Sequence, residues 1–510
     1  MGLATCVAKI AKHVTSKQID DFQFPMTFLK PDSFDSASKS LFQLSVFYRV
    51  LVIFCLILSA NFLSSYDSSS ILLSVNSISQ HPHNCYSKHK IAHAICSFFI
   101  KSSSSLCNWD GQHLSVIAQN GYTTDQSFAF FPGFPFLTKF ISFFFNSILR
   151  FSSPYLSTCL IGALVSNILL IMSCHYFFVL STLVLGHWKI SFKATLLFIV
   201  AHPGNVFFSV NYSESLFLFL TLFGLCHLFT VRLTNHSSES VRLVQSKMIV
   251  SMSSVIAFFF ASFVKSIGIF NVIFIIFTGF KDGYFKRFGK FIRLCLYCLL
   301  VTLPYFAFQF YSCSKVREIA PELCPKWHNF LQVYSKIQSK YWNIGAFNYW
   351  NLKQSPNFIL ASPLIFLTIT TVVTSCLIQL TLLNSLLFRS KIKKITSRTG
   401  RKFAIKTGDD VTVDSIQSST FDNFGLNSGF IFGFLLHLLI LFFIVLIFGH
   451  VQTISRILTV NPLNYWVLSW LIFANNQTKS KVYWGLFLFS CFSFLSIFGT
   501  VFFATFNPFT

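Results

Sequence analysis

Long apolar runs separated by polar segments recur along most of the chain. A helix needs about 20 predominantly apolar residues to cross the hydrocarbon core of a bilayer. Runs near that length are predicted at residues 41–63, 155–185, 194–210, 213–231, 248–280, 291–310, 357–383, 429–448, 457–473 and 482–503. The pattern predicts an all-α polytopic membrane protein: a multi-span helical bundle formed by one integral domain over residues 41–510.

Residues 1–40 are predicted to form a polar cytoplasmic arm. They contain no short apolar core near the start, so we expect no cleaved signal peptide, and the run at 41–63 would act as the signal anchor. Two further polar segments, residues 64–133 and 311–356, are too long for simple hairpin connections. We therefore expect built structure in both.

Short loops rich in Lys and Arg mark the cytoplasmic side of a membrane protein. Here these residues are Lys281, Lys286, Arg287, Lys290 and Arg293 and, in a basic loop over residues 389–428, Arg389, Lys391, Lys393, Lys394, Arg398, Arg401, Lys402 and Lys406. The segment 311–356 then lies on the opposite, exoplasmic side. If the arm is cytoplasmic, the segment 64–133 shares that side.

The run at residues 248–280 has 33 residues with Lys265 near its centre. It forms either one tilted span or two short helices with Lys265 at an exoplasmic turn. We favour two helices, because that leaves every basic residue of two neighbouring loops cytoplasmic, namely Lys189, Lys193, Arg232, Arg242 and Lys247. It requires residues 134–148 to stay embedded without crossing, and it predicts that Asn235, in an Asn-His-Ser acceptor, carries no glycan. Both interpretations give about 11 crossings and an exoplasmic Thr510.

Composition agrees with a membrane protein, since 53% of residues are hydrophobic and 11% are charged, against about 25% charged in soluble domains. The formal net charge of +23 is concentrated in short inter-helix segments that would face anionic lipid, so nucleic acid is not expected as a partner.

The 14 cysteines are scattered and show no zinc-ligand spacing, so we expect no metal site. Several lie inside apolar runs, where they are interpreted as small core residues. Cys313 and Cys324 both belong to the exoplasmic segment 311–356. A disulfide bridge and two free thiols are equally compatible with the sequence.

Acidic residues are informative because the chain has only 16. Those expected on the exoplasmic side are Asp67, Asp110, Asp125, Glu214, Glu318 and Glu322. Asp110 follows Trp109 and precedes residues 113–121, which have the pattern of an amphipathic helix lying on the membrane. An acid at that interface is placed to act as a general base on a lipid substrate. The alternative is an N-cap for the helix.

The sequence allows two roles for Glu214 and two for Lys265. Glu214 begins an apolar run, where a carboxylate either stabilises the helix macrodipole or faces a substrate cavity. Lys265 either meets a phosphate or is a side chain that snorkels to the interface. Residues 334–357 alternate aromatic rings with Gln, Asn and Lys, which fits an aromatic belt and also a sugar or lipid head-group site.

Four segments, taken together, resemble one family. They are Trp109-Asp-Gly-Gln-His113 through Gly121-Tyr122 to Phe128-Ala-Phe-Phe-Pro-Gly-Phe-Pro135; Asn205-Val-Phe-Phe-Ser209 with Tyr212-Ser-Glu-Ser215; Gln338-Ser-Lys-Tyr-Trp-Asn-Ile-Gly345 with Gln354-Ser-Pro-Asn-Phe358; and Arg456 with residues 462–466. The chain is similar here to the GPI mannosyltransferase 2 family, endoplasmic-reticulum enzymes that add the second mannose to the GPI-anchor precursor. It departs from that family at Lys265-Ser-Ile-Gly268, where Arg-Ser-Asn-Gly is usual, at residues 202–204 and in an insert after Arg389.

The resemblance implies a GT-C glycosyltransferase with a lumenal site, using dolichyl phosphate mannose and no metal or other cofactor. It implies an α-1,6-linked mannose on the GPI-precursor glycolipid, in the endoplasmic-reticulum membrane, and a small membrane-protein partner is compatible with it. Asp110 matches the family's first-loop acid and is the expected catalytic residue. The expected substrate-binding residues are Trp109, Gln112, Glu214, Lys265, Gln338, Tyr341, Trp342, Asn343, Gln354, Asn357 and Arg456.

Two other functions remain compatible with the membrane class. Another GT-C enzyme that uses a dolichyl-phosphate sugar would share the fold and the first-loop acid but would lack these four segments. A lipid or solute transporter would be expected to show internal repeats and broken helices with charges at the midplane. We find no repeat, and the polar residues gather at one face.

Overall fold

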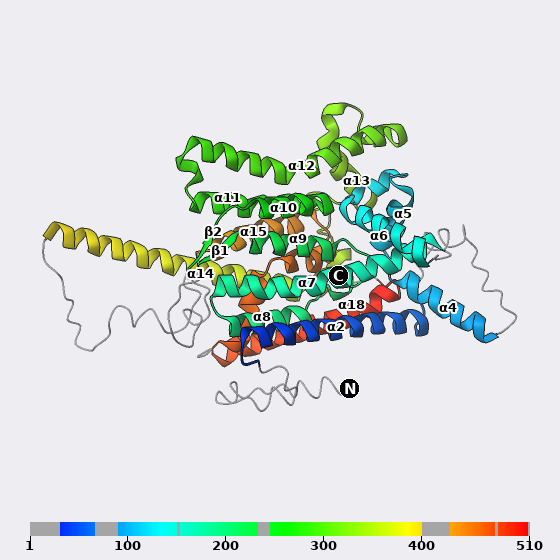
Figure 1. Cartoon of the computed structure of the whole chain (residues 1–510), viewed down its shortest axis with the longest axis horizontal. Helices are drawn as coiled ribbons and strands as arrows, with labels where there is room; N and C mark the ends of the chain where they lie inside the picture. Colours follow the sequence, from blue (N-terminus) through cyan, green and yellow to red (C-terminus); the bar gives the residue numbers. More distant parts are fainter. Residues whose placement is uncertain are drawn as a thin grey trace.

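Long apolar helices form the body of the chain in the computed structural model (Figure 1). The structure describes residues 31–66, 90–149, 153–232, 245–399, 429–474 and 478–507. Six of its helices are long and apolar enough to cross a membrane: α2 (Phe34–Phe62), α7 (Pro154–Leu185), α12 (Phe288–Ile319), α14 (Ser355–Thr399), α15 (Ile431–Phe448) and α18 (Lys479–Ala504). These helices confirm the prediction of a multi-span membrane protein.

Several sequence predictions fall outside the described ranges. They are residues 1–30 of the arm, Asp67, Asn235, Arg242, residues 400–428 of the basic loop and Thr510. The first part of that basic loop is helical, because α14 continues through Arg389 to Thr399.

Shorter helices pack among the long ones. They are α8 (Trp188–Val200), α9 (Glu214–Cys226), α10 (Met252–Val264), α11 (Val272–Lys281), the one-turn α16 (Ile454–Ile457) and α17 (Leu463–Phe473). Helix α9 lies between α7 and α10. Helices α8, α9 and α17 are mostly buried among their neighbours, so their apolar runs reflect burial in the bundle as much as contact with lipid, whereas α10 and α11 each keep exposed apolar residues.

The predicted run at 194–210 is wrong as a single helix. Helix α8 ends at Val200 and is followed by the 3₁₀ turn η3 (Asn205–Phe208). Pro203 lacks an N–H group and disfavours helical geometry in the residue before it, which explains the stop. Lys189 and Lys193, expected in a loop, lie instead in the first turns of α8.

The predicted break at Lys265 is present. Helix α10 ends at Val264, Lys265 has extended backbone, and the 3₁₀ turn η4 (Ser266–Asn271) leads into α11. A Cβ atom on Gly268 would lie 2.5 Å from the carbonyl of Ala261, so only glycine lets η4 fold back on α10.

The two helices on either side of this break run in opposite directions. Lys281, at the end of α11, lies over the ring of Phe430, and the same ring contacts Phe229. Phe229 pairs with Met248, just before α10. The start of α10 and the end of α11 therefore meet at one end of the bundle, and Lys265 lies at the turn.

A short antiparallel ribbon departs from the all-α prediction. Strands β1 (Phe229–Arg232) and β2 (Gln245–Met248) pair with Phe229 opposite Met248. The last residues of the predicted run 213–231 thus form a strand, since a short apolar segment rich in β-branched residues does not distinguish the two structures.

Both long polar segments contain built structure, as predicted. The first holds α4 (Lys90–Ser105), α5 (Asp110–Asn120), η2 (Asp125–Ala129) and the start of α6 (Gly133–Leu149). The second holds η6 (Pro321–Leu323), η7 (Trp327–Gln332), α13 (Val333–Trp342) and η8 (Leu352–Gln354). Helices α4, α5, α6 and α13 lie at one end of the bundle, and the basic end of α14 projects from the other (Figure 1).

The remaining 3₁₀ turns are η5 (Tyr284–Lys286), which joins α11 to α12, and η10 (Val451–Thr453) and η11 (Leu458–Val460), which flank α16. Two disulfide bridges have both of their cysteines within the described ranges. Cys313 is bridged to Cys324, one of the two alternatives left open by the sequence. The bridge between Cys107 and Cys159 was not predicted, because Cys159 lies in an apolar run.

Arg49, near the middle of α2, is a buried cation that sequence reasoning missed. It is 4% exposed. Its guanidinium donates to Asn205 Oδ1 at 2.6 Å and to Ser209 Oγ at 2.9 Å. The Asn205 amide in turn donates to Ser496 Oγ at 2.9 Å. This network ties η3 to α2 and α18.

Replacing Arg49 by Met should lower the free energy of unfolding by about 2–4 kcal/mol, because two buried oxygens lose their donors at about 1–3 kcal/mol each. Thermal unfolding of purified protein in detergent measures the change. Lys39, exposed on the same helix, supplies the control, and Lys39→Met should stay within about 0.5 kcal/mol of the parent. Equal stability of Arg49→Met and the parent would contradict the proposed stabilising role of the Arg49 hydrogen bonds.

The Cys313–Cys324 bridge predicts that neither thiol reacts with an alkylating reagent until a reductant is added. Mass spectrometry of the peptide that contains both residues reads the outcome. Exposed Cys295, which is not bridged, should be alkylated without reductant. Labelling of Cys313 and Cys324 before reduction would refute the bridge.

Candidate active site

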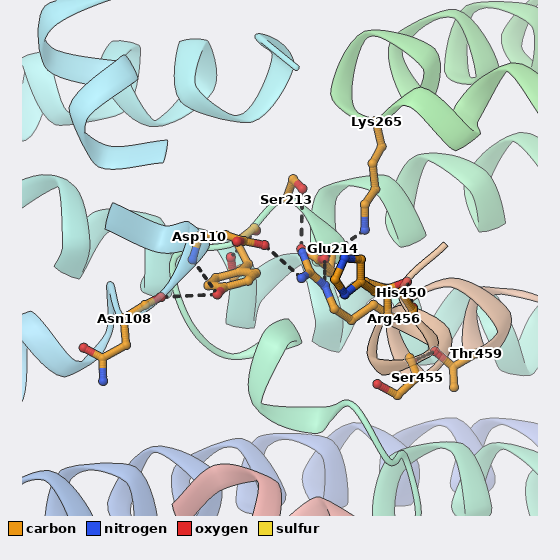
Figure 2. Close-up of polar contacts among 12 residues, drawn as sticks. Asn108, Asp110, Ser213, Glu214, Lys265, His450, Ser455, Arg456 and Thr459 are labelled. Atoms are coloured by element: carbon orange, nitrogen blue, oxygen red, sulfur yellow. Dashed lines mark hydrogen bonds and ion pairs between the residues drawn. The ribbon is translucent and has the colours of Figure 1, made fainter. Parts of the chain in front are cut away.

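Four charged side chains from distant parts of the chain meet at helix ends. Asp110 is the first residue of α5, Glu214 is the first residue of α9, and Lys265 follows the last residue of α10. Arg456 lies in α16. Figure 2 shows Lys265 and Arg456 both pointing toward Glu214, with Arg456 also reaching toward Asp110.

The four side chains form one continuous line of ion pairs, here called the charge chain. Arg456 Nη1 donates to Asp110 Oδ2 at 2.8 Å, and Arg456 Nε donates to Glu214 Oε1 at 2.5 Å. Lys265 Nζ donates to the same Glu214 oxygen at 2.8 Å. Glu214 is 1% exposed, whereas Asp110 is 29% exposed. Glu214 is thus the buried anchor, and Asp110 is the accessible end.

Burial makes the charge chain depend on all of its members. Removing charges from water costs several kcal/mol per ion, and only a close partner offsets that cost. Glu214 pairs with both cations through one oxygen. Its loss would leave Lys265 and Arg456 facing each other without an anion between them.

Aromatic rings and a tyrosine hydroxyl hold Arg456 and Asp110 in place. The Arg456 guanidinium lies 4.8 Å from the ring centre of Phe207 and 5.1 Å from that of Tyr212. The backbone N–H of Asp110 donates to Tyr212 Oη at 3.0 Å, and the Tyr212 hydroxyl donates to the carbonyl of Asn108 at 3.2 Å. The segment from η3 to α9 therefore positions both ends of the Arg456–Asp110 pair.

The start of α5 fits closely against that segment. A Cβ atom on Gly111 would lie 3.2 Å from the carbonyl oxygen of Asn211 and 3.3 Å from the Tyr212 ring. Trp109, just before, has φ of +56°, a left-handed conformation that is costly for a bulky residue. This local strain accompanies the placement of Asp110 toward Arg456.

The capping alternative is wrong for Asp110. Trp109, not Asp110, occupies the N-cap position of α5, and the Asp110 carboxylate bonds Arg456. Glu214 is in the first turn of α9, where a carboxylate stabilises the macrodipole, and its carboxylate also pairs with Lys265 and Arg456.

Helix α5 also corrects two expectations. Its residues Gly111, Gln112, Leu114, Ser115, Ile117 and Ala118 are buried, so the helix is packed within the protein rather than lying on the membrane. Gln112 is two residues from Asp110, about 200° around an α-helix, and therefore points away from the charge chain. Trp109 contacts the ring of Phe506 at 5.9 Å between ring centres.

Tyr341 belongs to a separate contact between the two long polar segments, residues 64–133 and 311–356. The Tyr341 hydroxyl donates to Asp125 Oδ1 at 2.6 Å, and Lys340 Nζ donates to Asp125 Oδ2 at 2.8 Å. Partial burial alone would raise the pKa of Asp125, but the hydrogen bonds from Lys340 and Tyr341 outweigh it and lower that pKa. These two hydrogen bonds join α13 to η2, with Asp125 in its charged form.

Other contacts of the second segment, at the end of α13, lie outside the charge chain. The carbonyl of Trp342 contacts His450 Nε2, and Asn343 ends α13 in a left-handed conformation with φ of +51°. Gln338 accepts the backbone N–H of Ile344 through its own backbone carbonyl at 3.3 Å.

Asn357 links η8 to the segment that carries Arg456. Its amide donates to Gln354 Oε1 at 2.7 Å and accepts from Gln452 Nε2 at 2.9 Å. Gln452 belongs to η10, four residues before Arg456. Gln354 and Asn357 are therefore placed to position α16.

His113 is a further candidate that the sequence reasoning quoted but gave no role. Its ring stacks on Phe130 at 5.0 Å between centres. Burial lowers its pKa, only partly opposed by Asp110, so the imidazole is neutral near pH 7. Among the described residues, no three His, Cys, Asp or Glu side chains gather as a metal site would require.

Comparison with known proteins supports the resemblance seen in the sequence. A Cricetulus griseus and a Homo sapiens protein, both named GPI alpha-1,6-mannosyltransferase 2, are each 31% identical to the chain. The first match covers 52% of this chain and 56% of the relative, and the second covers 51% and 56%. A Cryptococcus neoformans protein named GPI mannosyltransferase 2 is 26% identical, over 54% of this chain and 64% of its own length.

The matched part thus spans little more than half the length of the two mammalian relatives. No solved structure matches the chain. The model of the family described as mannosyltransferase (PIG-V) matches residues 38–510, which include all four members of the charge chain. The chain therefore belongs to the mannosyltransferase (PIG-V) family.

Proposed function

We propose that this protein transfers mannose from dolichyl phosphate mannose to the GPI-anchor precursor, adding the second mannose in α-1,6 linkage. The proposal rests on family membership and on one structural observation: the charge chain holds a carboxylate and two cations within one site. Transfer of a sugar from a lipid phosphate to a hydroxyl requires these same groups, a base for the hydroxyl and cations for the phosphate.

We place the site on the lumenal side of the endoplasmic-reticulum membrane. In support, Asp110 is the first residue of α5, which lies at the end of the bundle opposite to the one from which the basic end of α14 projects (Figure 1), and basic segments mark the cytoplasmic side. The six long helices together with α8, α9, α10, α11 and α17 would supply the proposed GT-C bundle of about 11 crossings.

In the proposed step the acceptor's 6-hydroxyl oxygen attacks C1 of the donor mannose. A new C1–O bond forms as the C1–O bond to phosphate breaks, and its electron pair stays on the departing dolichyl phosphate. A β-linked donor then gives an α-linked product. The hydroxyl proton passes to Asp110, whose Oδ2 is held by Arg456 and whose Oδ1 is the atom we assign to the acceptor.

The departing phosphate gains negative charge during this step. Lysine has three N–H donors and arginine has five; Glu214 takes one from each of Lys265 and Arg456, and Asp110 takes a second from Arg456. We assign the remaining donors of these two cations to the phosphate. Because Glu214 fixes both cations beforehand, they need no rearrangement when the charge develops.

The direct test uses membranes that lack their endogenous second mannosyltransferase. Expressing this chain and adding labelled dolichyl phosphate mannose should produce a GPI intermediate with one more mannose, removable by an α-1,6-specific mannosidase. Label appearing instead on dolichol-linked oligosaccharide or protein would overturn the proposed acceptor.

Asp110→Asn should lower turnover by about 10² to 10⁴, the usual contribution of general-base catalysis, while keeping the shape of the side chain. Initial rates in the same membranes measure the loss. Asp35→Asn, a matched change in the exposed first turn of α2, should leave the rate unchanged. Full activity of well-inserted Asp110→Asn would rule out the assigned role.

Glu214→Gln should lower kcat/KM by about 10², comparable to the loss of one preorganised electrostatic contact, because Lys265 and Arg456 lose their shared anion. Glu322→Gln, which alters a carboxylate with an exposed Lys340 contact, is the control expected to retain activity. Comparing yields of monodisperse protein separates a folding defect from a catalytic one. A Glu214→Gln protein that keeps parental kinetics would show that the anchor is dispensable.

A further inference from the structure

An apolar groove opens beside the turn that carries Lys265. It has a volume of about 570 Å³. One wall is formed by Phe259, Phe260 and Phe263 of α10, and the other by α12 around Leu303 and Ala307. Phe260 is 46% exposed and Leu303 is 44% exposed, so the groove opens to the outside of the bundle. On a membrane protein that side faces hydrocarbon.

The groove lies against the last turn of α10, which leads to Lys265. Phe263 precedes Lys265 by two residues. Pro132, also in the lining, precedes Gly133, where a Cβ atom would meet the Phe263 carbonyl oxygen at 2.9 Å and Val264 Cγ2 at 2.7 Å. The chain segment that follows α5 is thus packed directly on the last turn of α10. The groove is bounded by the two segments that carry Asp110 and Lys265.

We propose that this groove holds the isoprenoid chain of the donor, an inference that rests on the proposed function. Its lining is almost entirely aromatic and aliphatic, which suits a hydrocarbon chain and offers few partners to a sugar. Lys265 follows the helix that forms one wall, and its charge suits the phosphate to which that chain is joined.

The connectivity of the two lipid substrates favours the donor. In dolichyl phosphate mannose a single phosphodiester separates the hydrocarbon chain from the reacting C1 atom, so the chain must begin close to the charge chain. In the acceptor, phosphate, inositol, glucosamine and the first mannose separate the lipid from the reacting hydroxyl. The acceptor's hydrocarbon can therefore lie well away from Asp110, whereas the donor's cannot.

Ala307→Trp tests the groove by placing an indole ring in it. The donor KM of long-chain dolichyl phosphate mannose should rise roughly tenfold, the loss expected when about two methylene groups are no longer buried. The acceptor KM should stay unchanged. A short-chain donor such as citronellyl phosphate mannose, which has too little hydrocarbon to fill the groove, should show the same KM with the variant and the parent.

Leu299→Trp is the matched control, because Leu299 is a 56% exposed position on the same helix that does not line the groove. It should change none of these constants. A second measurement is independent of turnover: a polyprenyl phosphate carrying a photoreactive group in its chain should crosslink to peptides of α10 and α12, and Ala307→Trp should reduce that crosslinking.

The outcomes separate this inference from the proposed function. Parental protein that transfers mannose, combined with an unchanged long-chain donor KM and crosslinking in Ala307→Trp, would overturn the groove alone. A rise in acceptor KM would assign the groove to the acceptor's lipid instead. An equal rise for long- and short-chain donors would show a general distortion of the site and would also overturn the inference. Failure of the parental protein to transfer mannose would count against the proposed function.

Discussion

The guanidinium of Arg456 joins the two carboxylates around which the site is built. Through one nitrogen it holds Glu214 and through another it holds Asp110, while its face lies against Phe207 and Tyr212. These contacts connect α16 to the start of α9 and to the start of α5. Without the guanidinium, Asp110 would have no charged partner in the charge chain, and Glu214 would face Lys265 alone.

The rest of the structure supplies the rigid support that this arrangement needs. Arg49 ties η3 to α2 and α18, and η3 leads directly to Tyr212 and Glu214. Replacing buried ion pairs by apolar side chains is often neutral or stabilising, so a buried charge chain is weak evidence for stability. Its retention in a membrane bundle, where ionisable residues are costly, is better explained by chemistry.

Hydropathy predicted the class of fold because lipid imposes a strict length and composition on a spanning helix. It does not distinguish lipid-facing helices from covered ones, and it does not register a break inside an apolar run. The sequence therefore predicts one span at 194–210, although Pro203 interrupts it. The ribbon formed by Phe229–Arg232 was hidden for a similar reason, since a short apolar run fits a strand as well as a helix.

Within the site, Asp110, Glu214 and Lys265 were predicted because ionisable residues are scarce and conspicuous in apolar sequence. The centrality of Arg456 was not, because its partners lie 242 and 346 positions away in the chain. Gln112 shows that nearness in sequence is not nearness in space. It is two residues from Asp110 and therefore lies on the opposite face of α5. Pairings such as Cys107 with Cys159 likewise depend on how helices pack, which periodicity does not reveal.

The most direct measurement is a cryo-electron microscopy structure of the full chain in lipid nanodiscs with dolichyl phosphate mannose bound. The account predicts that the donor phosphate lies within hydrogen-bonding distance of Lys265 Nζ and of Arg456, with Glu214 still between the two cations and Asp110 facing the mannose C1 atom. A phosphate bound away from both cations, or an Asp110 carboxylate turned away from C1, would contradict it.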